Sequence, residues 1–166
     1  MVAMSLASLS RLMLLAARWG GSFLFMRVAV PLLGAVPTAA GRGLFSVAGL
    51  GLALACMGYR PRLGKYLWPL LLLGVINSGI PFLMYALAAQ VLPSGYSAIF
   101  NATTPLVATV VGALVFGEGI TPARVVAVLL GICGVAVLAQ AGPLEITPAV
   151  LGGMAVCFVA TVCYAF

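Results

Sequence analysis

The polar residues with the clearest spacing lie within one long apolar stretch of the chain. Four residues recur three or four positions apart and therefore share one narrow face of a helix. They are Ser97, Asn101, Thr104 and Ala108. Pro105 has no backbone N–H, so the carbonyl of Asn101 loses its partner within the helix. Interrupted helices with free carbonyls recur at substrate sites near the middle of membranes, so this face is a candidate binding surface.

A second proline and asparagine pair precedes it in the same stretch. Pro81 removes the helical partner of the Asn77 carbonyl, and Tyr85 falls on the same face as both. Two interpretations remain open for these polar side chains. They line a shared aqueous cavity, or they hydrogen-bond one helix to another, which contributes about 0.6 kcal/mol per bond.

Residues for other kinds of chemistry are missing from the sequence. The chain has no histidine, and its two acids, Glu118 and Glu145, lie at the ends of expected helices. No Ser–His, Cys–His or paired-carboxylate catalyst can be assembled, so we do not expect an enzyme. The four cysteines lie in apolar segments without a Cys-x-x-Cys spacing. We therefore expect no metal site, no disulfide framework and no cofactor.

Composition indicates what surrounds these residues. The chain of 166 residues is 64% hydrophobic and 6% charged, whereas a soluble domain carries about 25% charged residues. No charge occurs between Lys65 and Glu118, and a helix needs about 20 apolar residues to cross a bilayer. The net charge of +6 is scattered along the chain, so nucleic acid is not an expected partner. We expect an all-α integral membrane protein in contact with the lipid bilayer.

About six helices are expected, since each must cover a bilayer. They span residues 12–30, 39–58, 66–91, 94–117, 122–140 and 148–166. Pro31 and Pro37 are expected to bracket the first turn, and the Pro93-Ser94-Gly95 segment divides the uncharged stretch. Thr121 and Thr147 each precede a proline, which predicts a threonine N-cap followed by proline at the first helical position.

Basic residues predict the orientation. A cytoplasmic N-terminus leaves only Arg27 and Arg42 near the outer side, both at helix ends. In the same orientation five basic residues lie on the cytoplasmic side, namely Arg11, Arg60, Arg62, Lys65 and Arg124. Arg18 either extends to the cytoplasmic interface or lines a cavity. Arg27 and Arg42 either reach the outer headgroups or present a positive rim to an anionic substrate.

Several segments resemble the EamA family of the drug/metabolite transporter superfamily. RWGGSF (18–23) with Arg27 resembles its first helix, and GIPFLMYALA (79–88) with VLPSG (91–95) resembles its third helix and the following turn. NATTPL (101–106), GE (117–118) and TP (121–122) resemble its fourth helix and the start of the fifth, and GICGVAVL (131–138) the end of the first repeat. The chain departs from the family pattern at Arg18, usually apolar, and at Gly119, where a basic residue is common.

The resemblance implies ten helices in two inverted five-helix repeats, with both termini cytoplasmic. Residues 12–140 would form the first repeat, and 148–166 the first helix of a truncated second repeat, because Cys163 to Phe166 resembles the middle of that helix. It also implies a secondary carrier of small metabolites, amino acids or drugs in a bacterial inner membrane. The candidate substrate pathway comprises Trp19, Asn77, Pro81, Tyr85, Asn101 and Thr104.

Other possibilities follow from the expected truncation. A single repeat would need the second repeat of a longer chain, or a second copy of itself in a homodimeric half-size transporter. The alternative is a membrane scaffold or inactive remnant that transports nothing.

Overall fold

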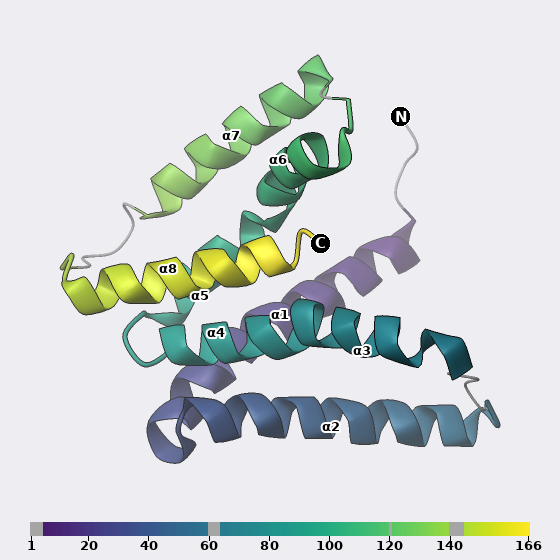
Figure 1. Cartoon of the computed structure of the whole chain (residues 1–166). Helices are drawn as coiled ribbons and strands as arrows, with labels where there is room; N and C mark the ends of the chain where they lie inside the picture. Colours follow the sequence, from purple (N-terminus) through teal and green to yellow (C-terminus); the bar gives the residue numbers. More distant parts are fainter. Residues whose placement is uncertain (1–4, 60–63, 120, 140–144) are drawn as a thin grey trace.

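The computed structural model describes residues 5–59, 64–119, 121–139 and 145–166, which form helices joined by short turns (Figure 1). No strand occurs within these ranges. The α-helices are α1 (Leu6–Leu33), α2 (Ala35–Cys56), α3 (Leu67–Gly74), α4 (Ile80–Ala88), α5 (Ser94–Ala102), α6 (Thr104–Phe116), α7 (Pro122–Ala139) and α8 (Pro148–Cys163). A 3-10 turn, η1 (Gly64–Tyr66), precedes α3, and a π-helical turn, η2 (Val75–Gly79), joins α3 to α4.

Four helical stretches in the described part are long and apolar enough to cross a membrane. They are Leu6–Leu33, Ala35–Cys56, Gly64–Ala88 and Ser94–Phe116. The helices α7 and α8 are also apolar, but with 18 and 16 residues they reach only about 27 and 24 Å. Many large apolar side chains point outward, such as Phe45, which is 83% exposed. These features confirm the prediction of an all-α protein that crosses the membrane several times.

The turn between the first two helices differs from the expected one. Helix α1 continues through Pro31, and the chain reverses at Gly34, whose φ of +88° is open to glycine at little cost. The Gly34 N–H donates to the Val30 carbonyl (2.8 Å), and the Thr38 hydroxyl donates to the Gly34 carbonyl (2.7 Å). Pro37 lies in the first turn of α2, where its missing N–H has no helical partner to lose. Pro31 and Pro37 therefore bracket the turn, but both lie inside the helices, so the turn is shorter than expected.

Both predicted threonine caps are confirmed. The Thr121 hydroxyl accepts a hydrogen bond from the Arg124 N–H at 3.3 Å, and α7 begins at Pro122. The Thr147 hydroxyl accepts from the Val150 N–H at 3.2 Å, and α8 begins at Pro148. Each threonine satisfies an N–H group that the first turn of a helix leaves without a partner.

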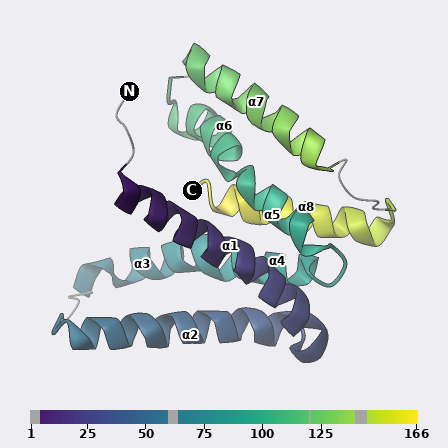
Figure 2. The same cartoon turned by 180° about the vertical axis from the view of Figure 1, so that it is seen from behind.

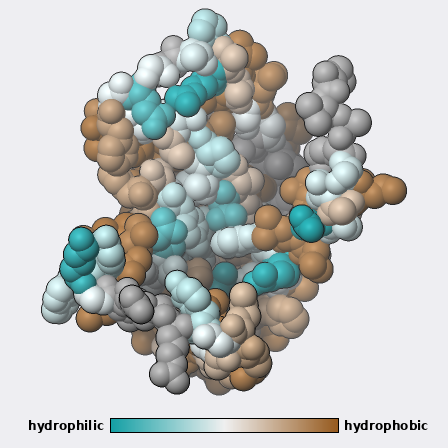
Figure 3. All heavy atoms as spheres, turned by 90° about the vertical axis from the view of Figure 1, so that its right-hand side faces the viewer, coloured by the Kyte–Doolittle hydropathy of each residue, from teal (hydrophilic) through white to brown (hydrophobic). Residues whose placement is uncertain are grey.

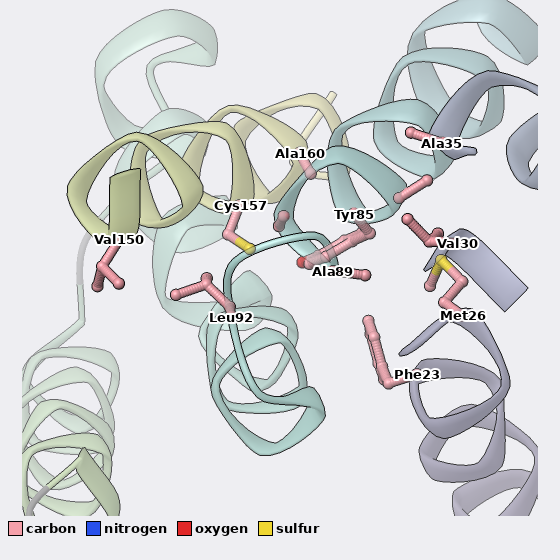
Figure 4. Close-up of a cluster of buried hydrophobic side chains, with 12 residues drawn as sticks. Phe23, Met26, Val30, Ala35, Tyr85, Ala89, Leu92, Val150, Cys157 and Ala160 are labelled. Carbon is pink, nitrogen blue, oxygen red and sulfur yellow. The ribbon is translucent and has the colours of Figure 1, made fainter. Parts of the chain in front are cut away.

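Helix α8 lies against the middle of the bundle, mainly along α4 and also against α5 and α6. Gly153 makes this approach possible, because a Cβ there would lie 2.7 Å from Val91 Cγ2 and 2.9 Å from Leu92 Cγ. The buried cluster around this contact contains Phe23, Met26, Val30, Ala35, Tyr85, Ala86, Ala88, Ala89, Leu92, Val150, Cys157 and Ala160 (Figure 4). The core is therefore built by α1, the first residue of α2, α4 with its following turn, and α8.

Helix ends gather on two sides of the molecule. The starts of α1, α3 and α7 and the ends of α2 and α6 lie on one side, to the right in Figure 1. The ends of α1, α4 and α7 and the starts of α2, α5 and α8 lie on the other, and the view from behind agrees (Figure 2). This alternation is the arrangement of a chain that crosses a layer repeatedly.

Candidate functional site

Tyr85 on α4 lies at the centre of the buried cluster and is only 2% exposed. Its ring packs edge-on against Phe23 of α1, with centroids 5.1 Å apart, and stacks on Tyr164 at 6.3 Å. Figure 4 shows Phe23 and Tyr85 facing each other across the space between α1 and α4. Such ring pairs add stabilisation beyond the area they bury. Tyr85 is therefore tightly held, and a ligand could reach it only if neighbouring helices moved.

The hydroxyl of Thr161 connects this tyrosine to α5. Its oxygen lies 3.5 Å from the phenol oxygen of Tyr85. It also lies 2.9 Å from the carbonyl oxygen of Cys157 and 3.3 Å from that of Phe100. A tyrosine O–H that donates to Thr161 leaves the threonine O–H to donate to one of these carbonyls. The three side-by-side elements α4, α8 and α5 are thus joined through one buried hydroxyl.

The first proline interruption takes the form of a wide helical turn. Asn77 lies in η2 and is half-buried. Pro81 is fully buried and is separated from the end of η2 by Ile80. At the end of η2 the Ile80 N–H donates to the Val75 carbonyl, five residues back instead of four. Single π turns inside α-helices are frequent at functional sites. The sequence predicted an interruption here, and the structure places it over Val75–Gly79.

The second interruption separates α5 from α6 at Thr103. Asn101 lies in the last turn of α5 and Thr104 begins α6, and both are half-buried. The Thr104 hydroxyl donates to the Asn101 carbonyl at 2.7 Å, and the Thr103 hydroxyl donates to the Phe100 carbonyl at 2.6 Å. The Asn101 carbonyl, which loses its helical partner because of Pro105, therefore has a side-chain partner instead.

The six candidate residues are only partly brought together. Tyr85 and the end of α5 are connected through Thr161. Asn77 lies in η2, which packs against α2, α3 and α4, whereas α5 packs against α1, α6, α7 and α8. Trp19 on α1 is 39% exposed. The span that contains Pro81 and the span that contains Pro105 thus pack mainly against other helices and little against each other. A pathway common to all six residues stays a prediction.

Three hollows accompany these elements. The largest, about 550 Å³, is apolar and lies between α5, α6, α7 and α8. The second, about 430 Å³, lies between α1 and α2, and the third, about 330 Å³, lies where α6 meets the start of α7. Figure 3 shows the face at the starts of α1, α3 and α7 hollowed, with hydrophilic side chains at its edge and in its floor. None of the six candidate residues lines any of these three hollows.

The apolar hollow, which the sequence analysis missed, has a signal in the sequence. Its lining residues on α5 and α6 are Tyr96, Ile99, Phe100, Thr103, Leu106, Val107 and Val110. Their spacing of three and four residues marks one helical face, separate from the polar face of Asn101 and Thr104. Opposite them lie Val128 of α7 and Met154 and Phe158 of α8. A cavity of this kind suits an apolar or aromatic group.

The fold and these interrupted spans agree with the family comparison, in which residues 7–140 match the EamA-like transporter family. The chain belongs to the EamA-like transporter family. It is also similar to Protein PecM of Dickeya dadantii (strain 3937), with 28% identity over 135 residues. That alignment covers 79% of this chain and 42% of PecM, so the chain spans less than half the length of this relative. No solved structure matches the chain.

Membership of this family confirms the resemblance and fits a membrane transporter better than an enzyme. The acid before Gly119 has a basic partner on α7. Arg124 Nη1 lies 3.1 Å from Glu118 Oε2 and 3.3 Å from the Gly119 carbonyl oxygen. Both side chains are about half exposed, and such pairs contribute roughly 0.2–1 kcal/mol.

Two arginines whose role the sequence left open have partners within the protein. Arg27 donates to the carbonyl of Ala89, just after the last turn of α4, where a cation also complements the helix dipole. The Arg42 guanidinium carbon lies 4.0 Å from the centre of the Phe82 ring. Arg18 is exposed and, with Arg42, lines the hollow between α1 and α2.

Proposed function

We propose that this EamA-like chain forms one half of a secondary carrier that moves small metabolites, amino acids or drugs across a membrane. The family match over residues 7–140 supports transport as the activity. Four stretches able to cross a bilayer, joined by short connections, support a function carried out inside the membrane. No described segment could form a separate soluble domain, since every loop is short.

The observation that carries this proposal is the pair of interrupted spans. The π turn beside Pro81 and the break at Thr103 beside Pro105 each place an asparagine at an irregular part of the backbone. Irregular backbone inside a bilayer is tolerated where it is covered by protein or lines a water-filled cavity. The proposed pathway passes Trp19, Asn77, Pro81, Tyr85, Asn101 and Thr104, and it requires α8 to move relative to α4, because Tyr85 is otherwise covered.

A complete pathway needs a second half. We propose that this is either the second repeat of a longer chain or a second copy of this one, since the chain corresponds to 42% of PecM. The proposed location is a bacterial inner membrane with the N-terminus in the cytoplasm. Arg11, Lys65 and Arg124 all lie near helix ends on the same side of the bundle, which supports this orientation by the positive-inside rule.

One observation favours the alternative of a scaffold that transports nothing. Tyr85 packs within the core, and the hydroxyls of Thr161 and Thr104 are used in bonds within the protein. Polar groups used in this way would join helices and need not line a path. The two functions differ in whether the protein moves any solute, and the two roles of the half-buried asparagines differ in whether their substitution alters uptake.

Reconstitution into liposomes tests the proposal. The chain is reconstituted alone and together with a second EamA-like half, and uptake of radiolabelled amino acids, small metabolites and drugs is compared with protein-free vesicles. Uptake by the chain alone would support a homodimeric carrier, and uptake only with the second half would support the two-repeat carrier. No uptake in either case contradicts the proposal.

Variants distinguish a pathway from helix joining. Asn101→Leu and Asn77→Leu are expected to reduce uptake at least about tenfold, because a site built for polar groups loses its hydrogen bonds. Ser97→Ala is the matched control on the same face of α5, since the contact of the Ser97 hydroxyl with Cys157 Sγ, at 3.9 Å, is a weak one. Uptake that is unchanged in all three variants would mean that the asparagines join helices and do not line the pathway.

A further inference from the structure

The hollow between α1 and α2 is lined by two positive charges. Arg18 and Ser22 lie on its α1 side, and Thr38 and Arg42 lie on its α2 side, around a volume of about 430 Å³. Both arginines stay charged at any physiological pH. A cavity that gathers two guanidinium groups within a membrane protein has a chemical preference of its own, independent of whether the chain transports anything.

No acid is available to neutralise these charges. The sequence has eight basic residues and two acids. Glu118 pairs with Arg124 at the hollow where α6 meets the start of α7, and Glu145 precedes α8. Neither acid lines the hollow between α1 and α2. The two arginines therefore have no carboxylate partner at this hollow, and an anion from outside the chain can compensate their charge.

Neutral contacts hold Arg42 in place. Its guanidinium carbon lies 4.0 Å from the centre of the Phe82 ring, and Nη1 lies 4.0 Å from Met26 Sδ. A ring and a thioether position the planar group without cancelling its charge. The remaining N–H donors of Arg42 are suited to a planar or tetrahedral oxyanion, which guanidinium groups bind through two parallel hydrogen bonds.

Arg18 supplies the second charge from a depth that is costly in lipid. It lies about 18 Å along α1 from Leu6, near the middle of the helix. Charged residues at such a depth face a partner or a water-filled cavity. The hydroxyl of Ser22, one turn further along α1, is a neutral donor on the same wall, whereas the Thr38 hydroxyl already donates to Gly34.

We propose that this hollow is a binding site for an oxyanion, a phosphate or carboxylate group, held by Arg18 and Arg42 with Ser22 as an additional donor. The group belongs either to the headgroup of an anionic lipid or to a small soluble anion. The same pair of arginines would bind both, so the source is settled by experiment.

The test uses the full chain in nanodiscs of phosphatidylcholine. Binding of radiolabelled inorganic phosphate is measured directly, and retention of phosphatidylglycerol is measured by native mass spectrometry after mixed-lipid reconstitution. Arg18→Gln and Arg42→Gln are each expected to weaken the observed binding at least about tenfold, because each removes charged hydrogen bonds. Arg11→Gln is the matched control, since Arg11 lies on the same helix outside the hollow.

Each result has a defined meaning. Saturable phosphate binding lost in both variants identifies a soluble anion, and selective retention of phosphatidylglycerol identifies a lipid headgroup. Arg42→Lys keeps the charge but loses the planar fork of donors, so it is expected to weaken binding less than Arg42→Gln does. Arg18→Gln carries the test if Arg42→Gln does not fold. The proposal is overturned if the wild type binds neither probe, or if Arg11→Gln loses as much binding as Arg18→Gln.

Discussion

The phenol oxygen of Tyr85 on α4 lies 3.5 Å from the hydroxyl oxygen of Thr161 on α8. The same threonine reaches the carbonyl of Phe100 on α5, so one buried polar contact joins α8 to two helices that lie far before it in the sequence. Because Tyr85 and Thr161 are buried, each group depends on the others for its hydrogen bonds. Substitutions at this contact can therefore measure how strongly α8 is held against α4.

Substitution of the two residues measures their coupling. Tyr85→Phe retains the ring contacts with Phe23 and is expected to cost about 1 kcal/mol of unfolding free energy, whereas Tyr85→Ala is expected to cost about 3–5 kcal/mol. In a double-mutant cycle with Thr161→Val, the coupling energy is expected to be about 0.6 kcal/mol. Unfolding in mixed detergent micelles provides the measurement. A coupling energy of zero would mean that the two oxygens do not interact.

Two adjacent glycines on α8 offer a matched test of packing. Gly153→Ala places a methyl group 2.7 Å from Val91 Cγ2 and 2.9 Å from Cγ of the fully buried Leu92, so it is expected to destabilise the chain by about 1–3 kcal/mol. A Cβ at Gly152 meets nothing within 4 Å, so Gly152→Ala is expected to be neutral or slightly stabilising, because alanine favours helix. Thermal unfolding of both variants checks this. Equal melting temperatures would show that α8 does not pack closely against Leu92.

Arg27 is expected to stabilise the end of α4. Arg27→Gln removes a charged donor to the Ala89 carbonyl and is expected to cost about 1 kcal/mol, reduced from the value of a fully buried bond because Arg27 is exposed. Arg11→Gln, at an exposed site near the start of the same helix, is the control. Hydrogen exchange at the backbone amides of residues 89–92 is expected to accelerate only in Arg27→Gln. Similar exchange in both variants would assign Arg27 to the membrane surface instead.

Membrane orientation is testable with single cysteines. In a variant lacking the four native cysteines, Ser5→Cys and Glu145→Cys lie at helix ends on opposite sides of the bundle. A maleimide that cannot cross the membrane, added outside intact cells, is expected to label only Glu145→Cys. Labelling of Ser5→Cys alone would reverse the orientation. Labelling of both would contradict the alternation of the helices.

Local chemistry explains which parts of the fold could be predicted. The caps at Thr121 and Thr147 involve groups three residues apart, and the interruption near Pro81 follows from a missing N–H, so neighbouring residues decide all three. The turn between Pro31 and Pro37 was expected, but it is shorter than expected because both prolines are compatible with helix in those positions.

Contacts between distant segments explain what could not be predicted. The sequence placed Tyr85 and Asn101 on polar faces, but it could not indicate that α8 would cover Tyr85, because that depends on Gly153 and Thr161. Likewise, the partners of Arg27 and Arg42 come from α4, and a helical face alone does not identify them. The six candidate residues therefore do not line a common hollow among those described.

The π turn at Val75–Gly79 alters the geometry of everything before it in that span. A wide turn holds one residue more than an α-turn, and one residue corresponds to about 100° of rotation. A single helical wheel drawn from Gly64 to Ala88 therefore assigns α3 to the wrong azimuth relative to α4. Cysteine-scanning accessibility along this span should show a jump in helical phase at Val75. Residues of α3 that such a wheel turns toward Tyr85 are exposed on the outside of the bundle instead.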